Sequence, residues 1–250
     1  MDSRYEAYCA AAEAEAAKVL ELVGTADPQL PVPTCPGWTA EKLVKHHGTT
    51  HRWMAYVIRN RVTERVWARD VPRQLPDDPA AYPDWLAESA ELSLAAMREA
   101  DPDTPMWTIG LDQHVRFWPR RLLYETAVHR ADLELALGRT PVIDAGAAVD
   151  GIDELLDLIG CFTELRDRVR ALGREGETLH LHATDADGEW LITLDGGCYT
   201  WQRGHAKGDV AVRGPAGDLL LLAYGRLSPE SFDVYGDRDL LAGWISATAL

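Results

Sequence analysis

Residues 118–132 read WPRRLLYETAVHRAD, and this stretch decides the fold of the N-terminal part of the chain. Glu125 and His129 are four residues apart, so on a helix they lie side by side on one face. Apolar residues share that face: Trp118, Leu122, Leu133 and Ala136. The face therefore points inward. We predict a helix over 116–137, ended by Gly138, that carries a carboxylate and an imidazole into a helical bundle.

An inward-facing carboxylate is costly unless another group compensates its charge. A divalent metal ion would compensate it, and bundle cores bind such ions through glutamate and histidine side chains. Alternatively, Glu125 hydrogen-bonds to His129, or pairs with an arginine such as Arg120 or Arg121. The spacing leaves these alternatives open.

A second helix, from the expected N-cap Thr39 to about residue 60, holds three of the eight histidines. His46 and His47 lie on or near its apolar face, so either could supply a third ligand. His47 and His51 are themselves four residues apart and form a rival pair. For these two, a solvated or hydrogen-bonded histidine is the more ordinary interpretation. Two histidines and one carboxylate leave an open coordination position, which is typical of catalytic zinc.

The remaining pattern extends this helix pair into two domains. Helices are expected at 2–24, 39–60, 83–100 and 116–137, which favours an up-down four-helix bundle. A connecting helix is expected at 147–172. Alternation of polar and apolar residues then predicts strands at 178–183, 190–194, 199–201 and 209–213, with helices at 215–225 and 238–248. We expect an α+β chain: a bundle over 1–146, a connection over 147–175 and a small antiparallel α+β domain over 176–250.

Other histidines give weaker signals. His180 and His182 alternate along one strand face and are a candidate metal pair, although a solvated or interface face is the more ordinary interpretation. His205 lies in a turn-rich loop.

Composition excludes several classes of partner. The 250 residues carry a net charge of −15, which argues against nucleic acids and against anionic membrane surfaces. No apolar run reaches membrane-spanning length, and the N-terminus lacks the features of a signal peptide. The four cysteines are irregularly spaced, so neither a disulfide framework nor a cysteine zinc site is expected. We expect a cytoplasmic protein.

Three stretches together resemble the mycothiol-dependent maleylpyruvate isomerase family. The first is VPTCPGWT at 32–39 with His46 seven residues later, the second is 118–132, and the third comprises 179–190 with 203–214. The resemblance implies a DinB-like four-helix bundle that binds zinc through His46, Glu125 and His129. It also implies a sterol-carrier-like C-terminal domain that helps to cover the active site.

The resemblance further implies mycothiol as a thiol co-substrate, bound to the metal as the nucleophilic thiolate. The thiolate would add to a small electrophilic substrate, leading to isomerisation or to S-transfer. Asp132, three residues after His129, is a candidate acceptor that orients its imidazole, with a surface aspartate as the alternative. Arg120, Arg121 and Arg226 are candidates for binding an anionic substrate. A non-enzymatic metal-dependent binding or regulatory protein is the second hypothesis, and a metal-dependent hydrolase is the third.

Overall fold

The computed structural model describes residues 3–249, and its contacts divide the chain into two compact units. Unit 1 is Met1–Pro141 and unit 2 is Val142–Leu250. The predicted α+β class is confirmed, since unit 1 is helical and unit 2 contains a five-stranded sheet. Within residues 3–249, no helix combines the length and apolarity that crossing a bilayer requires.

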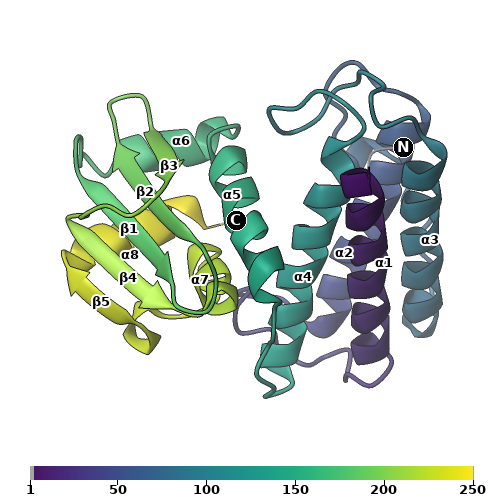
Figure 1. Cartoon of the computed structure of the whole chain (residues 1–250). Helices are drawn as coiled ribbons and strands as arrows, with labels where there is room; N and C mark the ends of the chain where they lie inside the picture. The colour runs from purple at the N-terminus through teal and green to yellow at the C-terminus, as the bar shows by residue number, and fades with distance from the viewer. Residues whose placement is uncertain (1–2, 250) are drawn as a thin grey trace. The chain divides into compact units, whose positions relative to one another are not determined.

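Unit 1 is a bundle of four helices: α1 (Ser3–Val23), α2 (Ala40–Arg59), α3 (Tyr82–Glu99) and α4 (Phe117–Ala136) (Figure 1). Helix α1 packs on α3 and α4, and α2 packs on α3. All four helices were predicted from the sequence. Thr39 caps α2 as expected, because its side chain accepts a hydrogen bond from the Lys42 amide. Two short 3₁₀ turns, η1 (Ala68–Asp70) and η2 (Pro79–Ala81), lie in the loop before α3.

Helix α4 is buried on most of its circumference, which is unusual for a helix with this many charged residues. Trp118 and Leu122 are fully buried in the core. Arg130 is 3% exposed and donates to Glu15 on α1 at 2.6 Å, so its charge is paired inside the bundle. Buried charges are tolerated where such partners exist. Helix α4 therefore buries charged side chains together with its apolar ones.

Helices α2 and α3 approach closely at Gly48. A Cβ atom added at this glycine would overlap the ring of Trp85 on α3, which is itself 3% exposed. The missing side chain thus lets the tryptophan ring lie directly on the backbone of α2, two residues after His46.

We predict that Gly48→Ala destabilises unit 1 by about 1–3 kcal/mol, because overpacking a close helix contact outweighs the helix propensity gained with alanine. Urea unfolding followed by tryptophan fluorescence measures the change. Gly24→Ala is the control, since its Cβ would meet only Leu20 and Glu21 carbonyl oxygens at 3.5 Å. Equal stability of Gly48→Ala and the wild type would contradict this packing.

Unit 2 begins with α5 (Ala145–Ile159) and α6 (Thr163–Arg170). A single helix over 147–172 was predicted, and this is wrong. Helix α5 ends at the C-cap Gly160, and Phe162 has an extended backbone before α6 begins. Glycine has low helix propensity, which allows the break.

The sheet of unit 2 has the strand order β3-β2-β1-β4-β5 (Figure 1). Its strands are β1 (Thr178–Ala183), β2 (Glu189–Leu194), β3 (Tyr199–Arg203), β4 (Val210–Gly214) and β5 (Asp233–Gly236). The expectation of an antiparallel sheet is wrong for one pair, since β1 and β4 are parallel. The loop after β3 returns the chain to the far side of β1, so β4 enters in the direction of β1. Strand β5 was not predicted, because four residues carry too little alternation.

Helices α7 (Ala216–Ala223) and α8 (Arg238–Thr248) were both predicted, and both pack on the sheet. A 3₁₀ turn, η3 (Pro229–Ser231), precedes β5. Leu179 and Leu181 of β1 are buried, and His180 and His182 project to the opposite face because side chains alternate along a strand.

Candidate metal centre

His46, Glu125 and His129 converge in unit 1. His46 Nε2 lies 2.9 Å from Glu125 Oε1, and His129 Nε2 lies 3.5 Å from the same oxygen. One donor atom from each residue lies within 4.8 Å of the other two. Ligand atoms about 2.1 Å from a tetrahedral zinc ion lie about 3.3 Å from one another. The observed distances are therefore close to those of a three-ligand site.

Helix geometry and a preceding loop build this arrangement. Glu125 and His129 are neighbours on α4, while His46 comes from the second turn of α2. The Trp38 ring stacks on His129 with centroids 5.9 Å apart and also contacts His46 at 5.1 Å. Trp38 is held there because its carbonyl oxygen accepts a hydrogen bond from the Val32 amide.

Asp132 fixes the orientation of His129. It is 0% exposed, and its Oδ2 lies 2.8 Å from His129 Nδ1. Thr34 Oγ1 donates to Oδ1 at 2.6 Å, and Cys35 Sγ donates to Oδ2 at 3.3 Å. A carboxylate that accepts the Nδ1 proton leaves the Nε2 lone pair of the imidazole available to a cation. The sequence suggested Asp132, but it did not suggest Thr34, Cys35 or Trp38.

These missed residues lie in the segment VPTCPGW at 32–38. Its prolines indicated only that the segment is not helical. Gly37 has φ +77°, a conformation that favours glycine, and it forms the turn that delivers Trp38. The available signal was a run of polar and aromatic residues among the prolines and glycine of this segment. Nothing local in the sequence indicates which helix these residues contact.

Arg121 pairs with Glu125, which was one of the alternatives to a metal ion that the spacing left open. Its Nη2 donates to Glu125 Oε2 at 2.8 Å, and the arginine is 2% exposed. The pair leaves Oε1 facing the two histidines, so the arginine and a metal ion can use different oxygens of one carboxylate. Arg120 is half-buried on α4. Arg226 lies in unit 2, where its Nη1 donates to the Tyr224 carbonyl oxygen at 2.7 Å.

His47 and His51 are buried in the bundle rather than solvated, with 1% and 2% exposure. His51 Nδ1 lies 2.7 Å from Ser93 Oγ, so its polarity is satisfied. Burial lowers the pKa of His51 to about 4 and the pKa of His47 well below its usual value. Among residues 3–249, His47 Nε2 has no hydrogen-bond partner. Of the adjacent pair His46 and His47, the structure brings His46 into contact with Glu125.

Charges around the three residues are strongly coupled. Burial raises the pKa of Glu125, but hydrogen bonds from His129 and His46 and the charge of Arg121 outweigh it and hold this pKa well below the usual range. Burial lowers the pKa of His129, yet hydrogen bonds to Asp132, Cys35 and Glu125 raise it well above its usual value. The raised pKa means that His129 holds a proton on Nε2 as well as on Nδ1, so a divalent transition-metal ion would displace the Nε2 proton on binding to this set of two imidazoles and one carboxylate.

Two family models match the chain over most of its length. The mycothiol maleylpyruvate isomerase N-terminal domain matches residues 9–134, and the MDMPI C-terminal domain matches residues 146–243. The chain belongs to the mycothiol maleylpyruvate isomerase family. The predicted family is confirmed, and membership in it supports the prediction of an enzyme. No curated protein matches the chain.

Two solved structures are similar in fold to this chain. They are the mycothiol-dependent maleylpyruvate isomerase and a mutant of it, each with 16% sequence identity, a TM-score of 0.61 and 92% coverage of both chains. At this identity the likeness shows the fold: a helical bundle followed by an α+β domain.

We predict that His46→Ala and His129→Ala each lower the zinc content of the purified protein by one equivalent, because each removes one of the three candidate ligands. Elemental analysis after dialysis measures the loss. His114→Ala is the matched control, since His114 lies in the loop before α4 and bonds to Asp112. Zinc retained in His46→Ala but lost in His129→Ala would move the third ligand to His47 or His51.

We also predict that Asp132→Asn weakens zinc binding about 10- to 100-fold, as expected when a carboxylate that orients a histidine ligand loses its charge. Competition with a chromophoric chelator measures the affinity. Asp144→Asn, at the N-cap of α5, is a control for the loss of one carboxylate. An unchanged affinity in Asp132→Asn would show that Asp132 does not position the imidazole for metal binding.

Proposed function

We propose that this chain is a metal-dependent enzyme that uses mycothiol either to isomerise a small electrophilic substrate or to form a thioether adduct with it (S-transfer). The observation that carries the proposal is the convergence of His46, Glu125 and His129 in a chain that the two family models cover. We assign these three residues as ligands of a divalent ion, with zinc as the expected metal. When bound, the ion supplies Lewis acidity, which favours the thiolate form of a coordinated thiol.

The surrounding residues have separate roles in this proposal. Asp132 holds the proton on His129 Nδ1, which directs the Nε2 lone pair toward the donor cluster. Arg121 offsets the charge of Glu125 and fixes one of its oxygens. Trp38 covers the two imidazole rings and excludes water from that side.

Access to the centre is from the side of His46 and Glu125, whose side chains are 34% and 22% exposed. A thiol and a small substrate can therefore reach the donor atoms from solvent. The Lys42 ammonium lies 5.3 Å from the Trp38 ring centroid, on the side of the centre that Trp38 covers. Arg120, on the same helix as Glu125, is the candidate in unit 1 for binding an anionic substrate, whereas Arg121 is engaged with Glu125 and Arg226 belongs to unit 2.

We predict that the zinc-loaded full-length protein converts activated cis-alkenes only when mycothiol is present. Following alkene geometry by absorbance and free thiol by titration separates the two reactions. An isomerase returns the thiol, because the C–S bond formed in addition is broken in elimination. A transferase consumes one thiol for each product molecule.

The His129→Ala variant is expected to lose at least 100-fold in rate, whereas His114→Ala is expected to retain the wild-type rate. Cysteine in place of mycothiol tests whether the protein recognises the thiol or only accelerates its addition. Turnover of ester or amide substrates without any thiol would contradict the proposal and favour the hydrolase. Zinc-loaded protein that binds mycothiol but converts no substrate would favour a binding or regulatory role.

A further inference from the structure

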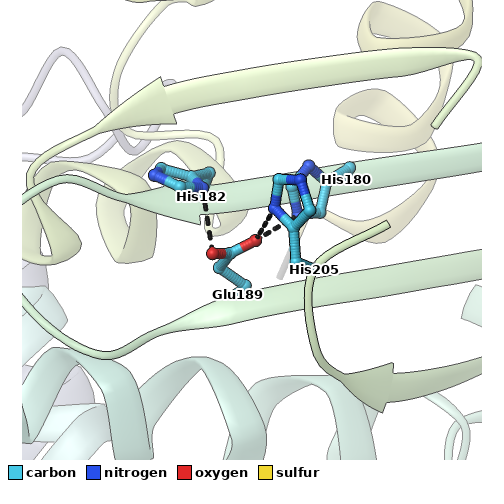
Figure 2. Close-up of side chains that lie close together, drawn as sticks. All are labelled: His180, His182, Glu189 and His205. Atoms are coloured by element: carbon cyan, nitrogen blue, oxygen red, sulfur yellow. Dashed lines mark hydrogen bonds and ion pairs between the residues drawn. The ribbon is translucent and has the colours of Figure 1, made fainter. Parts of the chain in front are cut away.

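A second group of metal-binding side chains lies in unit 2, and we call it the sheet cluster: His180, His182, Glu189 and His205. Figure 2 shows the Glu189 carboxylate with His182 on one side and His180 and His205 on the other. The nitrogen-to-oxygen distances are 3.0 Å from His180 Nε2, 3.3 Å from His182 Nδ1 and 2.6 Å from His205 Nδ1. Three imidazoles thus converge on one carboxylate.

Strand register brings three of these residues together. His182 on β1 is paired directly with Glu189 on β2, so their side chains share one face of the sheet. His180 precedes His182 by two residues and therefore points to the same face. This face is opposite to Leu179 and Leu181, which are buried in the core of unit 2.

A tight turn after β3 supplies the fourth residue. Gly204 has φ +137°, which favours glycine, and its amide donates to the Glu189 carbonyl oxygen at 3.1 Å. This hydrogen bond anchors the loop directly beside the carboxylate. His205, the next residue, then lies with its ring centroid 5.4 Å from that of His180.

The burial of His180 is unusual for the outer face of a sheet. It is 5% exposed, whereas His205 has a side chain that is 78% exposed. The interpretation of this face as simply solvated is therefore wrong for His180.

The donor atoms have the spacing of a four-coordinate site. One atom from each of the four residues lies within 4.8 Å of the other three. A tetrahedral ion with ligands at about 2.1 Å needs donor separations of about 3.3 Å, so the most widely separated donor atoms would have to approach one another by up to about 1.5 Å. An open hollow of about 650 Å³, lined by the three histidines and Lys207, gives an ion a path from solvent.

We propose that the sheet cluster is a second metal site, which binds a divalent transition-metal ion of the zinc or copper class through three imidazoles and one carboxylate. Imidazole-rich sets select such ions over magnesium and calcium. Four protein ligands close the coordination sphere, which is typical of a structural site. The ion joins β1, β2 and the loop after β3, and so stabilises the outer face of the sheet.

Zinc binding to the full chain in a His129→Ala background tests the proposal, because this background removes the centre in unit 1. Isothermal titration with zinc is expected to give one equivalent. Addition of His182→Ala is expected to weaken that binding at least tenfold, whereas addition of His114→Ala leaves it unchanged. His182 is preferred to His180 as the site of mutation because it is half-buried, so its removal disturbs the fold less.

A parallel comparison guards against a misfolded double variant. In the wild-type background, Glu189→Gln keeps the side-chain shape and is expected to remove one zinc equivalent, while the equivalent bound in unit 1 remains. Cobalt substituted for zinc is expected to give a visible absorption band that depends on His182 and Glu189. Absence of zinc binding in His129→Ala, or binding there that is insensitive to His182→Ala, would overturn the second site without affecting the first.

Discussion

His129 lies between two carboxylates, and the organisation of unit 1 depends on how their charge is compensated. Glu125 lies on its Nε2 side and Asp132 on its Nδ1 side. Two carboxylates about two turns apart on one largely buried helix would be unstable in an apolar interior without partners. Each partner comes from a different part of the chain: Arg121 from α4, His46 from α2, and Thr34 and Cys35 from the loop before α2. The contacts that compensate these carboxylates therefore also hold α2 and the loop before it against α4.

The same requirement explains how α4 can bury charged side chains. A helix with apolar residues on one stripe can leave its charged face in water. Helix α4 instead buries Arg121, Arg130 and Asp132, and each has a hydrogen-bonding partner of opposite charge or complementary polarity. Breaking a buried pair leaves an uncompensated charge, which costs more than an exposed pair contributes. These polar pairs, together with the apolar core around Trp118, determine which segments pack against α4.

The two clusters reach similar chemistry through different backbone geometry. In unit 1, helical spacing of four residues places Glu125 beside His129, and a second helix adds His46. In unit 2, strand pairing places His182 opposite Glu189, alternation adds His180, and a glycine turn adds His205. The unit 1 cluster has three donors near an entrance, as expected for catalysis, whereas the sheet cluster has four, as expected for a structural ion.

Local pattern in the sequence determined the helices of the bundle, four of the five strands and the adjacency of Glu125 and His129. Each of these depends on spacing within a few residues of one segment, which the chain's periodicity records directly. Spacing alone left His46 and His47 open as the third candidate and the family resemblance pointed to His46. The tertiary structure places His46 beside Glu125, because adjacent helical residues point about 100° apart and only one of them can face α4 in this way. It also decided the contacts of Thr34, Cys35 and Trp38, the parallel pairing of β1 with β4, and the arrival of His205 beside Glu189. These contacts join residues far apart in the chain, and they depend on how whole elements pack rather than on any local repeat.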